Sequence, residues 1–314
     1  MTKKVRIIAI SVLAVLIVLG CILGVHYHMK NKITFTVRDT LPDGQGKDAV
    51  VILLGGQSNA SGCSLDEYLR RNVTEEKYAE YPNGYDNVYI NYLAGLNVSN
   101  GFVKCATAQG EAGGYFGPEL GMAEKLHEMY PDETVFIIKY AWGGSDLYTQ
   151  WLSPSSKGKT GDLYKQFVAY VETSLQYLVS KNYNIRIEGM CWMQGESDTT
   201  DFKGERYFDN QCAFVSYLRA DLAPYAEEGG IYFIDAGISD GPYCEPAYPA
   251  VNEAKRRFSE LSPLNLYFST IDEGLTTLYE PEGDPDYGHY DALCEIRLGQ
   301  LFAERVIESY CARP

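Results

Sequence analysis

The residues most able to do chemistry in this sequence lie in a short glycine-rich segment. Residues 55–62 read GGQSNASG and directly follow an apolar run, so Ser58 is predicted on a tight turn between a strand and a helix. A serine on such a turn has an exposed hydroxyl, and the backbone amides of the turn point toward the same space. Glycines permit the sharp bend and a close approach of the backbone. The segment suits an acyl-transfer nucleophile, although similar turns also occur without any catalytic role.

A serine nucleophile needs a base, and histidine is the usual one. Beyond residue 30 the chain has two histidines, His127 and His289. His127 lies inside a predicted helix, where a bystander role is expected. His289 lies in a predicted loop with carboxylates nearby at Asp284, Asp286 and Asp291. Because a carboxylate three residues before a histidine can reach its Nδ1 and fix its tautomer, we predict His289 as the base.

Two further loops offer hydrogen-bond donors for a developing oxyanion. In residues 141–145, AWGGS, either Gly143 or Gly144 can present a backbone N–H. A simple glycine turn with the tryptophan packed on the sheet is the structural alternative. In residues 192–198, WMQGESD, the side-chain amide of Gln194 lies at a predicted strand end and is a third candidate donor.

Three residues beside these positions are candidates for substrate contact: Gln57, Asn59 and Glu196. Glu196 and Asp198 also suit the N-terminal turn of a helix, where the helix dipole favours carboxylates. A structural role is therefore the alternative for these two acidic residues.

Strands and helices alternate along the body of the chain. Short apolar runs rich in β-branched residues predict strands at 49–54, 87–91, 134–140, 185–192, 231–234 and 266–270. Helical spacing of apolar residues falls between them, at 118–129, 163–178, 208–222 and 294–302. This pattern predicts an α/β fold whose mainly parallel sheet is covered by helices on both sides. Ligands of such sheets bind at the carboxyl ends of the strands, where the loops described above lie.

The N-terminus predicts a membrane anchor. Residues 7–25 form an uninterrupted apolar run long enough for one helix across a bilayer. The basic residues Lys3, Lys4 and Arg6 precede it, which predicts a single-pass protein of the cell membrane with its N-terminus inside and its catalytic domain extracellular. Lipidation at Cys21 is the alternative, because residues 18–21 resemble a bacterial lipobox.

We divide the chain into an anchor at 1–30, a stalk or linker at 31–48 and a catalytic domain at 49–314. The net charge is −15, and residues 1–30 contain no acidic residue, so the remainder is still more acidic. Such a surface repels phosphate backbones, and nucleic acid is not expected as a partner. The eight cysteines show no metal-binding spacing, so no metal site is predicted.

Taken together, the motifs resemble those of the SGNH (GDSL-like) hydrolases. They are most similar to the sialate O-acetylesterase and acetylxylan esterase branch, carbohydrate esterase family six. The shared motifs are GQSN at 56–59, FGPE at 116–119, GGS at 143–145, WMQGESD at 192–198 and DYGH at 286–289. They occur in the family's order. Two departures are Ala60, where the branch commonly has methionine, and Tyr290, where it commonly has phenylalanine.

The resemblance implies a flavodoxin-like, three-layer α/β/α fold and a carbohydrate O-acetylesterase without a cofactor. It implies Ser58 as nucleophile, His289 as base and Asp286 as the carboxylate that orients it. The implied oxyanion hole consists of the Ser58 amide, a Gly143 or Gly144 amide and the Gln194 side chain.

The substrate stays open among acetylated xylan, O-acetyl sialic acid and acetylated cell-wall glycans. Two other interpretations remain. One is an α/β-hydrolase, since residues 56–60 come close to the GxSxG motif. The other is a non-catalytic carbohydrate-binding module on an esterase fold, to which the 26 tyrosines would be suited.

Overall fold

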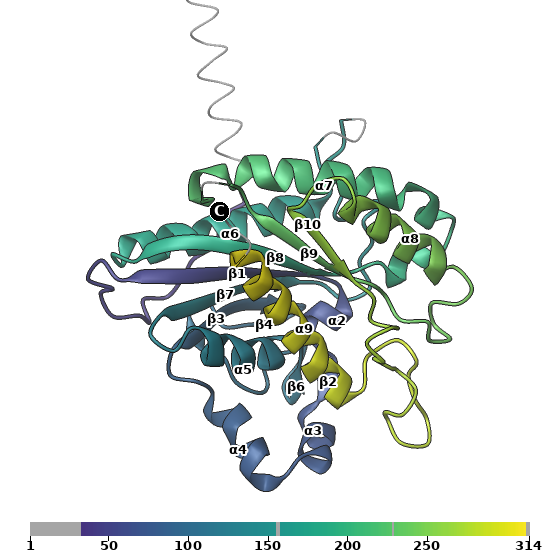
Figure 1. The fold of residues 1–314 in the computed structure, drawn as a ribbon, viewed down its shortest axis with the longest axis horizontal. Coiled ribbons are helices and arrows are strands. Elements are labelled where there is room, and N and C mark those ends of the chain that lie inside the picture. Colours follow the sequence, from purple (N-terminus) through teal and green to yellow (C-terminus); the bar gives the residue numbers. More distant parts are fainter. Residues whose placement is uncertain (1–32, 155–157, 228, 312–314) are drawn as a thin grey trace, which may run out of the picture. The chain divides into compact units, whose positions relative to one another are not determined.

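The computed structural model describes residues 33–311 except 155–157 and 228. The chain divides into two compact units, Met1–Thr34 and Phe35–Pro314, and nearly all of the first lies outside the described residues. The second unit is built on one large sheet whose strand order is β10-β9-β8-β1-β7-β3-β4 (Figure 1). Six of these strands run parallel: β1 (Asp48–Gly56), β3 (Val88–Ala94), β7 (Thr134–Ala141), β8 (Asn184–Met193), β9 (Tyr232–Ala236) and β10 (Asn265–Phe268).

Short antiparallel strands complete the sheets. One edge of the large sheet is extended by β4 (Asn97–Val98) and β5 (Val103–Lys104), which both pair with β3. A separate two-stranded sheet joins β2 (Ser64–Leu65) to β6 (Tyr115–Phe116). This small sheet links the segment after the Ser58 turn to the FGPE motif.

Helices cover both faces of the large sheet, which gives three layers (Figure 1). On one face lie α6 (Asp162–Ser180), α7 (Tyr207–Asp221) and α8 (Tyr248–Ser259). On the other lie α5 (Glu119–Met129) and α9 (Ala292–Cys311), with α3 (Asp66–Asn72) and α4 (Glu75–Asn83) beyond them. The short helix α2 (Ser58–Ser61) follows β1 directly. The predicted mainly parallel α/β/α architecture is confirmed.

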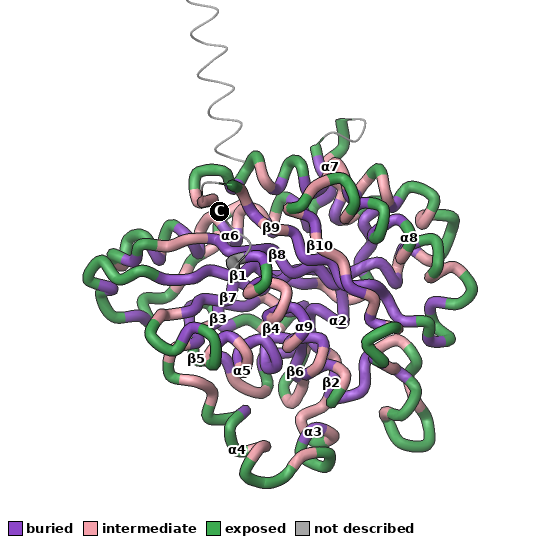
Figure 2. The backbone as a smooth tube through the Cα atoms, viewed as in Figure 1, coloured by how far each residue is buried: buried purple, intermediate pink, exposed green. Residues whose placement is uncertain are grey.

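The central strand β1 explains why its sequence is almost wholly apolar. Residues 49–56 of this strand are all buried, because β7 and β8 flank it and helices cover both of its faces. Figure 2 shows the same burial along the middle of the sheet. A parallel strand in this position has no solvent-facing side, so alternation of polar and apolar residues is lost. All six predicted strands are present, whereas α8, α3 and α4 were not predicted.

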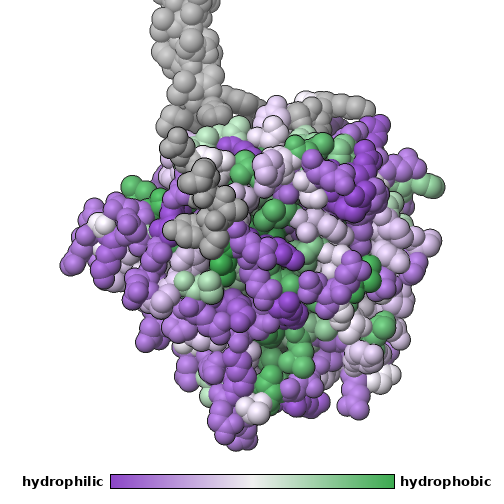
Figure 3. Space-filling model, viewed as in Figure 1, coloured by the Kyte–Doolittle hydropathy of each residue, from purple (hydrophilic) through white to green (hydrophobic). Residues whose placement is uncertain are grey.

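The surface contrasts with this core. On the face shown in Figure 3, hydrophilic residues predominate and apolar residues form smaller patches. The net charge of −15 is in keeping with such a surface.

A buried ion pair connects the FGPE motif to the sheet. Lys139 of β7 and Glu119 of α5 are both fully buried, and Lys139 Nζ donates to Glu119 Oε2 over 2.7 Å. The other oxygen, Glu119 Oε1, accepts the N–H of Gly117 over 2.9 Å. An unpaired charge at this depth would be strongly destabilising, so each residue requires the other. Glu119 of the FGPE motif therefore has a structural role.

Helices α5 and α9 cross at two glycines. A Cβ added at Gly299 would lie 1.9 Å from the carbonyl oxygen of Pro118, and one at Gly121 would lie 1.9 Å from the carbonyl oxygen of Ile296. No side chain fits at either position without moving a backbone. These two glycines therefore set the spacing between the helices.

We expect Gly299→Ala to lower the free energy of unfolding by about 1–3 kcal/mol, because the added methyl group overpacks the crossing. Thermal unfolding checks the effect. Gly113→Ala is the matched control, since a Cβ there meets nothing within 4 Å and no positive φ is required. Equal melting temperatures for the two variants would contradict the role of Gly299.

Residues 35–47, which follow the predicted anchor, contact the domain. The Phe35 ring packs edge-on against Tyr170 at a centroid distance of 5.2 Å, and the backbone N–H groups of Thr40 and Leu41 donate to the Tyr177 hydroxyl. The predicted anchor itself, residues 7–25, lies outside the described residues. None of the helices within the described residues combines the length and the apolar character needed to cross a bilayer.

The six cysteines whose side chains are described are free thiols: Cys63, Cys105, Cys191, Cys212, Cys244 and Cys294.

Candidate active site

Three strands end together at the edge of the sheet where the candidate residues lie. Gly56 at the end of β1 is in register with Ala141 of β7 and with Met193 of β8. Ser58, Gly143 and Gly195 each come two residues after this row, in the loops that leave the three strands. Since β1 is the central strand of the three, its loop lies between the other two. The parallel register thus brings together three segments that are far apart in the sequence.

The turn after β1 requires glycine at position 56. Gly56 has φ +141°, and a Cβ there would lie 1.8 Å from the carbonyl oxygen of Met193. The chain then bends, the N–H of Gln57 donates to the same carbonyl over 2.9 Å, and α2 begins at Ser58. Ser58 is 8% exposed, and its hydroxyl makes no hydrogen bond with any residue that the structure describes, His289 included. The hydroxyl therefore has no structural task.

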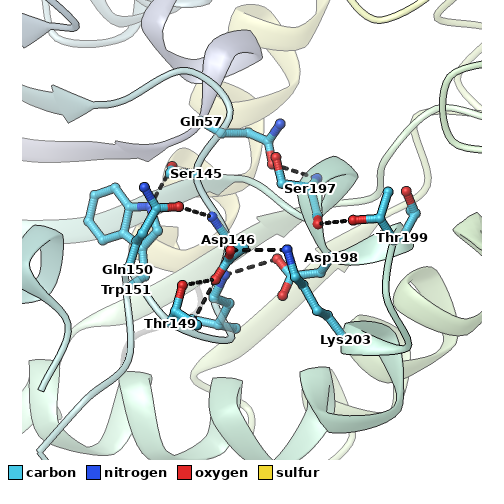
Figure 4. A network of polar contacts seen from close by, with 12 residues as sticks. Gln57, Ser145, Asp146, Thr149, Gln150, Trp151, Ser197, Asp198, Thr199 and Lys203 are labelled. Carbon is cyan, nitrogen blue, oxygen red and sulfur yellow. Dashed lines mark hydrogen bonds and ion pairs between the residues drawn. The ribbon is translucent and has the colours of Figure 1, made fainter. Parts of the chain in front are cut away.

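Backbone amides near Ser58 are also unused. The N–H groups of Ser58, Gly143 and Gly144 donate to no acceptor within the described part of the chain. The turn that carries both glycines is fixed by Ser145, whose hydroxyl donates to the Trp142 carbonyl over 2.6 Å. The same hydroxyl accepts the indole N–H of Trp151 over 2.7 Å (Figure 4). Unused amides on a rigid turn are the kind of donor that stabilises an oxyanion.

His289 is oriented by Asp286. Its Nδ1 lies 2.7 Å from Asp286 Oδ2, while Oδ1 of the same carboxylate accepts the backbone N–H groups of His289 and Gly288, each over 2.9 Å. A carboxylate beside Nδ1 selects the tautomer with the proton on Nδ1, which leaves Nε2 as the basic nitrogen. Asp284, the other nearby acid before His289, has no such contact with it among the described residues. The structure therefore pairs His289 with Asp286, and the catalytic roles of the two residues stay predictions.

The charges around His289 favour its protonated form. Burial lowers the pKa of the imidazole, but the hydrogen bond and negative charge of Asp286, together with Glu196 and Glu111, outweigh burial and raise the pKa above the ordinary value of 6.5. For Asp286 the signs are opposite: burial raises its pKa, and the contacts with His289 and neighbouring N–H groups lower the pKa overall. The pair is thus stabilised as imidazolium and carboxylate.

Asn59 joins the His289 loop to the Ser58 turn. Its Nδ2 donates to the Gly288 carbonyl over 3.1 Å, and its Oδ1 accepts the N–H of Tyr290 over 3.2 Å. His289 therefore stands between two residues that are both bonded to the residue after Ser58. The same Nδ2 donates to Glu196 Oε1 over 2.6 Å, which fixes the rotamer of Asn59. One side chain thus joins the loop of the candidate base to the turn of the candidate nucleophile.

Glu196 is buried at 1% exposure, with its Oε2 left without a partner within the described residues. Burial raises the pKa of this carboxyl group, and the hydrogen bond from Asn59 acts against that rise. Gln57 and Asn59 are buried as well, at 2% and 1% exposure. The three predicted substrate-contact residues thus have protein partners, and their contact with substrate stays a prediction.

Gln57 and Gln194 form a buried connection behind the turns. Gln57 Oε1 accepts from Gln194 Nε2 over 3.3 Å and from the N–H group of Gly195 over 3.2 Å. It also accepts the N–H group of Ser197 over 3.2 Å (Figure 4). Gln194 Nε2 also lies 3.1 Å from the Ser145 carbonyl and 2.6 Å from Asp198 Oδ2. Its two N–H groups thus face three acceptors.

The opposite end of Gln194 is also occupied, since its Oε1 accepts the Tyr207 hydroxyl over 2.9 Å. To donate to an oxyanion, this fully buried amide would have to release one of its present acceptors. Asp198, one of those acceptors, has its pKa raised to about 6 by burial.

Glu111 is a site residue that the sequence did not reveal. It lies in the loop before β6, and both of its carboxylate oxygens lie 2.7 Å from the place where a Cβ on Gly143 would stand. Its Oε2 is also 3.3 Å from the Sγ of Cys63. No strand end or spacing marks this position; the only signal is an acidic residue shortly before the FGPE motif.

A cavity of about 370 Å³ opens beside these residues. Its wall contains His289 and Asp286, which places it next to the candidate base. The other lining residues are Cys63, Ser64, Leu65, Tyr68, Glu111, Ala112, Tyr115, Glu280, Pro281 and Tyr290. Within the residues that the structure describes, no group of His, Cys, Asp and Glu side chains is arranged to hold a metal ion.

Comparison with known families decides the class of this fold. The family model for carbohydrate esterase, sialic acid-specific acetylesterase, matches residues 48–308. The chain belongs to this family. It is therefore a carboxylic ester hydrolase of the carbohydrate esterase class, and the α/β-hydrolase interpretation does not hold. None of the curated proteins searched matches the chain significantly.

Solved structures agree with this fold. A protein from Arabidopsis thaliana is 17% identical, with a TM-score of 0.61 and coverage of 86% of this chain and 100% of that one. NanS is also 17% identical at a TM-score of 0.61, covering 88% of this chain and 100% of its own. A carbohydrate acetylesterase from Xanthomonas citri is 16% identical, with a TM-score of 0.58 and coverage of 85% of this chain and 57% of that one.

Proposed function

We propose that this carbohydrate esterase removes O-acetyl groups from sugars by two-step acyl transfer at Ser58. The proposal is supported by the hydrogen bonds of Asn59 with Gly288 and Tyr290, which join the loop of the His289–Asp286 pair to the turn of Ser58, whose hydroxyl is unused. The unused amides of Ser58 and the Gly143–Gly144 turn supply the second requirement, donors for the oxyanion. Acyl transfer needs a serine near a base and donors for the oxyanion, whereas a site that only binds sugar needs neither feature.

In the first step, Ser58 Oγ attacks the acetyl carbonyl carbon while His289 Nε2 takes the hydroxyl proton. The negative charge that develops on the carbonyl oxygen is stabilised by the free amides. The bond from the acetyl carbon to the sugar oxygen then breaks, and His289 returns the proton to that oxygen as the sugar leaves. The acetyl group is now an ester of Ser58.

In the second step, His289 takes a proton from water, and the resulting hydroxide equivalent attacks the acetyl-serine. Acetate departs, and the proton returns to Ser58 Oγ. Asp286 stabilises the imidazolium in both steps without taking its proton. All catalytic groups in this scheme are residues of the chain, and the ester and water are the two reactants.

The remaining predicted residues are best assigned to positioning. Asn59 and Glu196 hold the His289 loop, and Gln57 and Gln194 hold the turns after β1, β7 and β8. We propose that these side chains act through the geometry of Ser58 and His289. Gln194 remains a third oxyanion donor only if it exchanges an acceptor during the reaction.

Acetate release from acetylated carbohydrates tests the proposal. The full chain is incubated with acetylated xylan, acetylated mannan, O-acetyl sialic acid and p-nitrophenyl acetate, and free acetate is measured against an enzyme-free blank. We expect release from p-nitrophenyl acetate and from at least one carbohydrate. Hydrolysis of p-nitrophenyl acetate without release from any sugar would contradict the carbohydrate specificity, and the absence of any hydrolysis would favour a non-catalytic binding module.

The pKa of His289 gives a prediction for the pH profile. The base must be neutral, so kcat/KM should fall as the pH drops through the raised pKa of His289, with a midpoint above 6.5. Asp286→Asn removes the main contacts that raise this pKa, so the acidic limb should move to lower pH while the maximum rate decreases. Asp132→Asn, at the amino end of the sheet, should leave the midpoint in place. A midpoint that does not respond to Asp286→Asn would contradict the assignment.

We also propose that the enzyme is held at the cell surface by its N-terminus. Only the apolar run at 7–25 and the basic residues before it support this proposal. The full chain should then sediment with membranes and be released by detergent, whereas a chain beginning near residue 31 should not sediment. Equal distribution of both chains would contradict the anchor.

A further inference from the structure

The cavity beside His289 adjoins a second cavity, and the second adjoins a third, because each neighbouring pair has residues of its wall in common. A second cavity of about 570 Å³ also has Glu111 and Ala112 in its wall. This second cavity shares Trp142 with a third, of about 910 Å³, which extends to Tyr148 and Arg206. The three cavities thus follow one another from Tyr115 to Tyr148, and we call this row the edge groove. Trp142, which directly precedes the proposed oxyanion donors Gly143 and Gly144 in the chain, lines the second and third cavities.

The two ends of the edge groove carry aromatic side chains. Tyr68 and Tyr115 line the cavity beside His289, whereas Trp142 and Tyr148 line the far cavity. Tyr148 is 44% exposed and its hydroxyl bonds to no residue that the structure describes, so its ring is available for stacking. Large rings that combine an apolar face with a polar edge suit the alternating C–H faces and hydroxyl edges of sugars.

The two ends of the edge groove differ in the charge of the side chains that line them. The cavity beside His289 is lined by three carboxylates, those of Glu111, Glu280 and Asp286, and has no lysine or arginine in its wall. A carboxylate on the sugar at this point would meet like charge, and the imidazole of His289, already paired with Asp286, would be the one nearby group able to carry a positive charge. Basic residues, such as Arg206, occur only in the far cavity. The sugar that carries the ester is therefore expected to be uncharged.

We infer that the substrate is a neutral glycan chain of several sugar units, bound along the edge groove with the acetyl ester on a unit beside His289. This inference rests on the proposed function, since it takes Ser58 and His289 as the reacting centre. It goes beyond that function because it states that the preferred substrate is a glycan of several sugar units and that these sugars are neutral. A free O-acetylated sialic acid would fill only one cavity and would bring a carboxylate to the acidic end.

Substrate length tests the inference with the full chain. Acetate release is measured on acetylated xylose, on acetylated xylo-oligosaccharides of increasing length, on free O-acetyl sialic acid and on p-nitrophenyl acetate. We expect kcat/KM to rise about tenfold from the single sugar to the longer chains, the size that one or two aromatic stacking contacts supply. O-acetyl sialic acid is expected to be a poorer substrate than the neutral chains.

Tyr148→Ala should remove most of the gain with length, measured as the ratio of kcat/KM for the longest chain to that for acetylated xylose. Tyr217→Ala is the matched control, because Tyr217 is an exposed tyrosine on α7 that lines none of the three cavities. Its ratio should equal that of the unmodified protein.

The outcomes separate the two proposals. No hydrolysis of p-nitrophenyl acetate or of any sugar ester would overturn the proposed function itself. Hydrolysis of the small esters without a gain in the longer chains, or a preference for free O-acetyl sialic acid, would overturn the edge groove as a glycan site. An equal loss of the length gain in Tyr148→Ala and Tyr217→Ala would overturn it as well.

Discussion

Ser58→Ala is expected to lower kcat for acetate release by roughly 10⁴-fold or more, because the variant has no oxygen to accept the acetyl group. The substitution removes one buried hydroxyl that bonds to no described residue, so the fold should be unaffected. Steady-state kinetics on p-nitrophenyl acetate and on an acetylated glycan measure the loss, and thermal unfolding verifies the fold. KM should change much less than kcat, since the removed atom acts in the chemical step.

Ser61→Ala is the matched control for that variant. Ser61 lies three residues further along α2, is fully buried, and its Oγ also lacks a hydrogen-bond partner among the described residues. We expect it to retain nearly full activity. If Ser58→Ala kept substantial turnover, or if both variants lost activity equally, Ser58 would not be the nucleophile.

His289→Ala is expected to cost a similar factor, roughly 10⁴-fold in kcat, because the variant lacks the proposed base that takes the proton of Ser58. The matched control is His127→Ala. His127 stacks on Tyr85 at a centroid distance of 4.8 Å, and its Nδ1 lies 2.6 Å from Asn87 Oδ1, in the region between α5 and β3. Its loss should lower stability while activity per folded molecule is retained.

The double variant Ser58→Ala/His289→Ala provides a further check. Residues that act as one unit have strongly non-additive effects, so the double variant should be about as active as either single variant. Additive losses would mean that the two residues serve separate purposes. Activity that survives His289→Ala but disappears in His127→Ala would reverse the assignment of the base.

The sequence predicted the elements whose signal is local. An apolar run in front of GGQSN identified β1 and the turn that carries Ser58, because a strand buried on both faces has no polar positions. His289 could be predicted because the chain beyond residue 30 has only one other histidine, and the DYGH spacing indicated Asp286 as its partner.

What the sequence did not reveal depends on contacts between distant segments. Asn59 appeared as a substrate-contact residue, yet it bonds to Gly288 and Tyr290, more than 200 positions away. No spacing in the sequence encodes that contact. The backbone of Glu111 is hydrogen-bonded to Gly62 and its side chain lies beside Gly143, so its place at the candidate site could not be predicted.

Buried charges were missed for the same reason. Lys139 interrupts an apolar strand, and its partner Glu119 belongs to a helix of another segment. Lys255 of α8 donates to Asp235 of β9 over 2.5 Å, with both side chains buried. Each of these residues alone would predict a solvent-facing position, and only the pairing explains its burial.

Covalent trapping tests Ser58 as the nucleophile most directly. A dialkyl p-nitrophenyl phosphate is incubated with the full chain; attack by the nucleophile forms an oxygen–phosphorus bond and releases p-nitrophenolate, and the adduct is located by peptide mass spectrometry. We expect one adduct, on Ser58, whose formation parallels the loss of esterase activity and which is absent in Ser58→Ala. An adduct on a different residue that tracks inactivation, or inactivation that persists in Ser58→Ala, would contradict catalysis at Ser58.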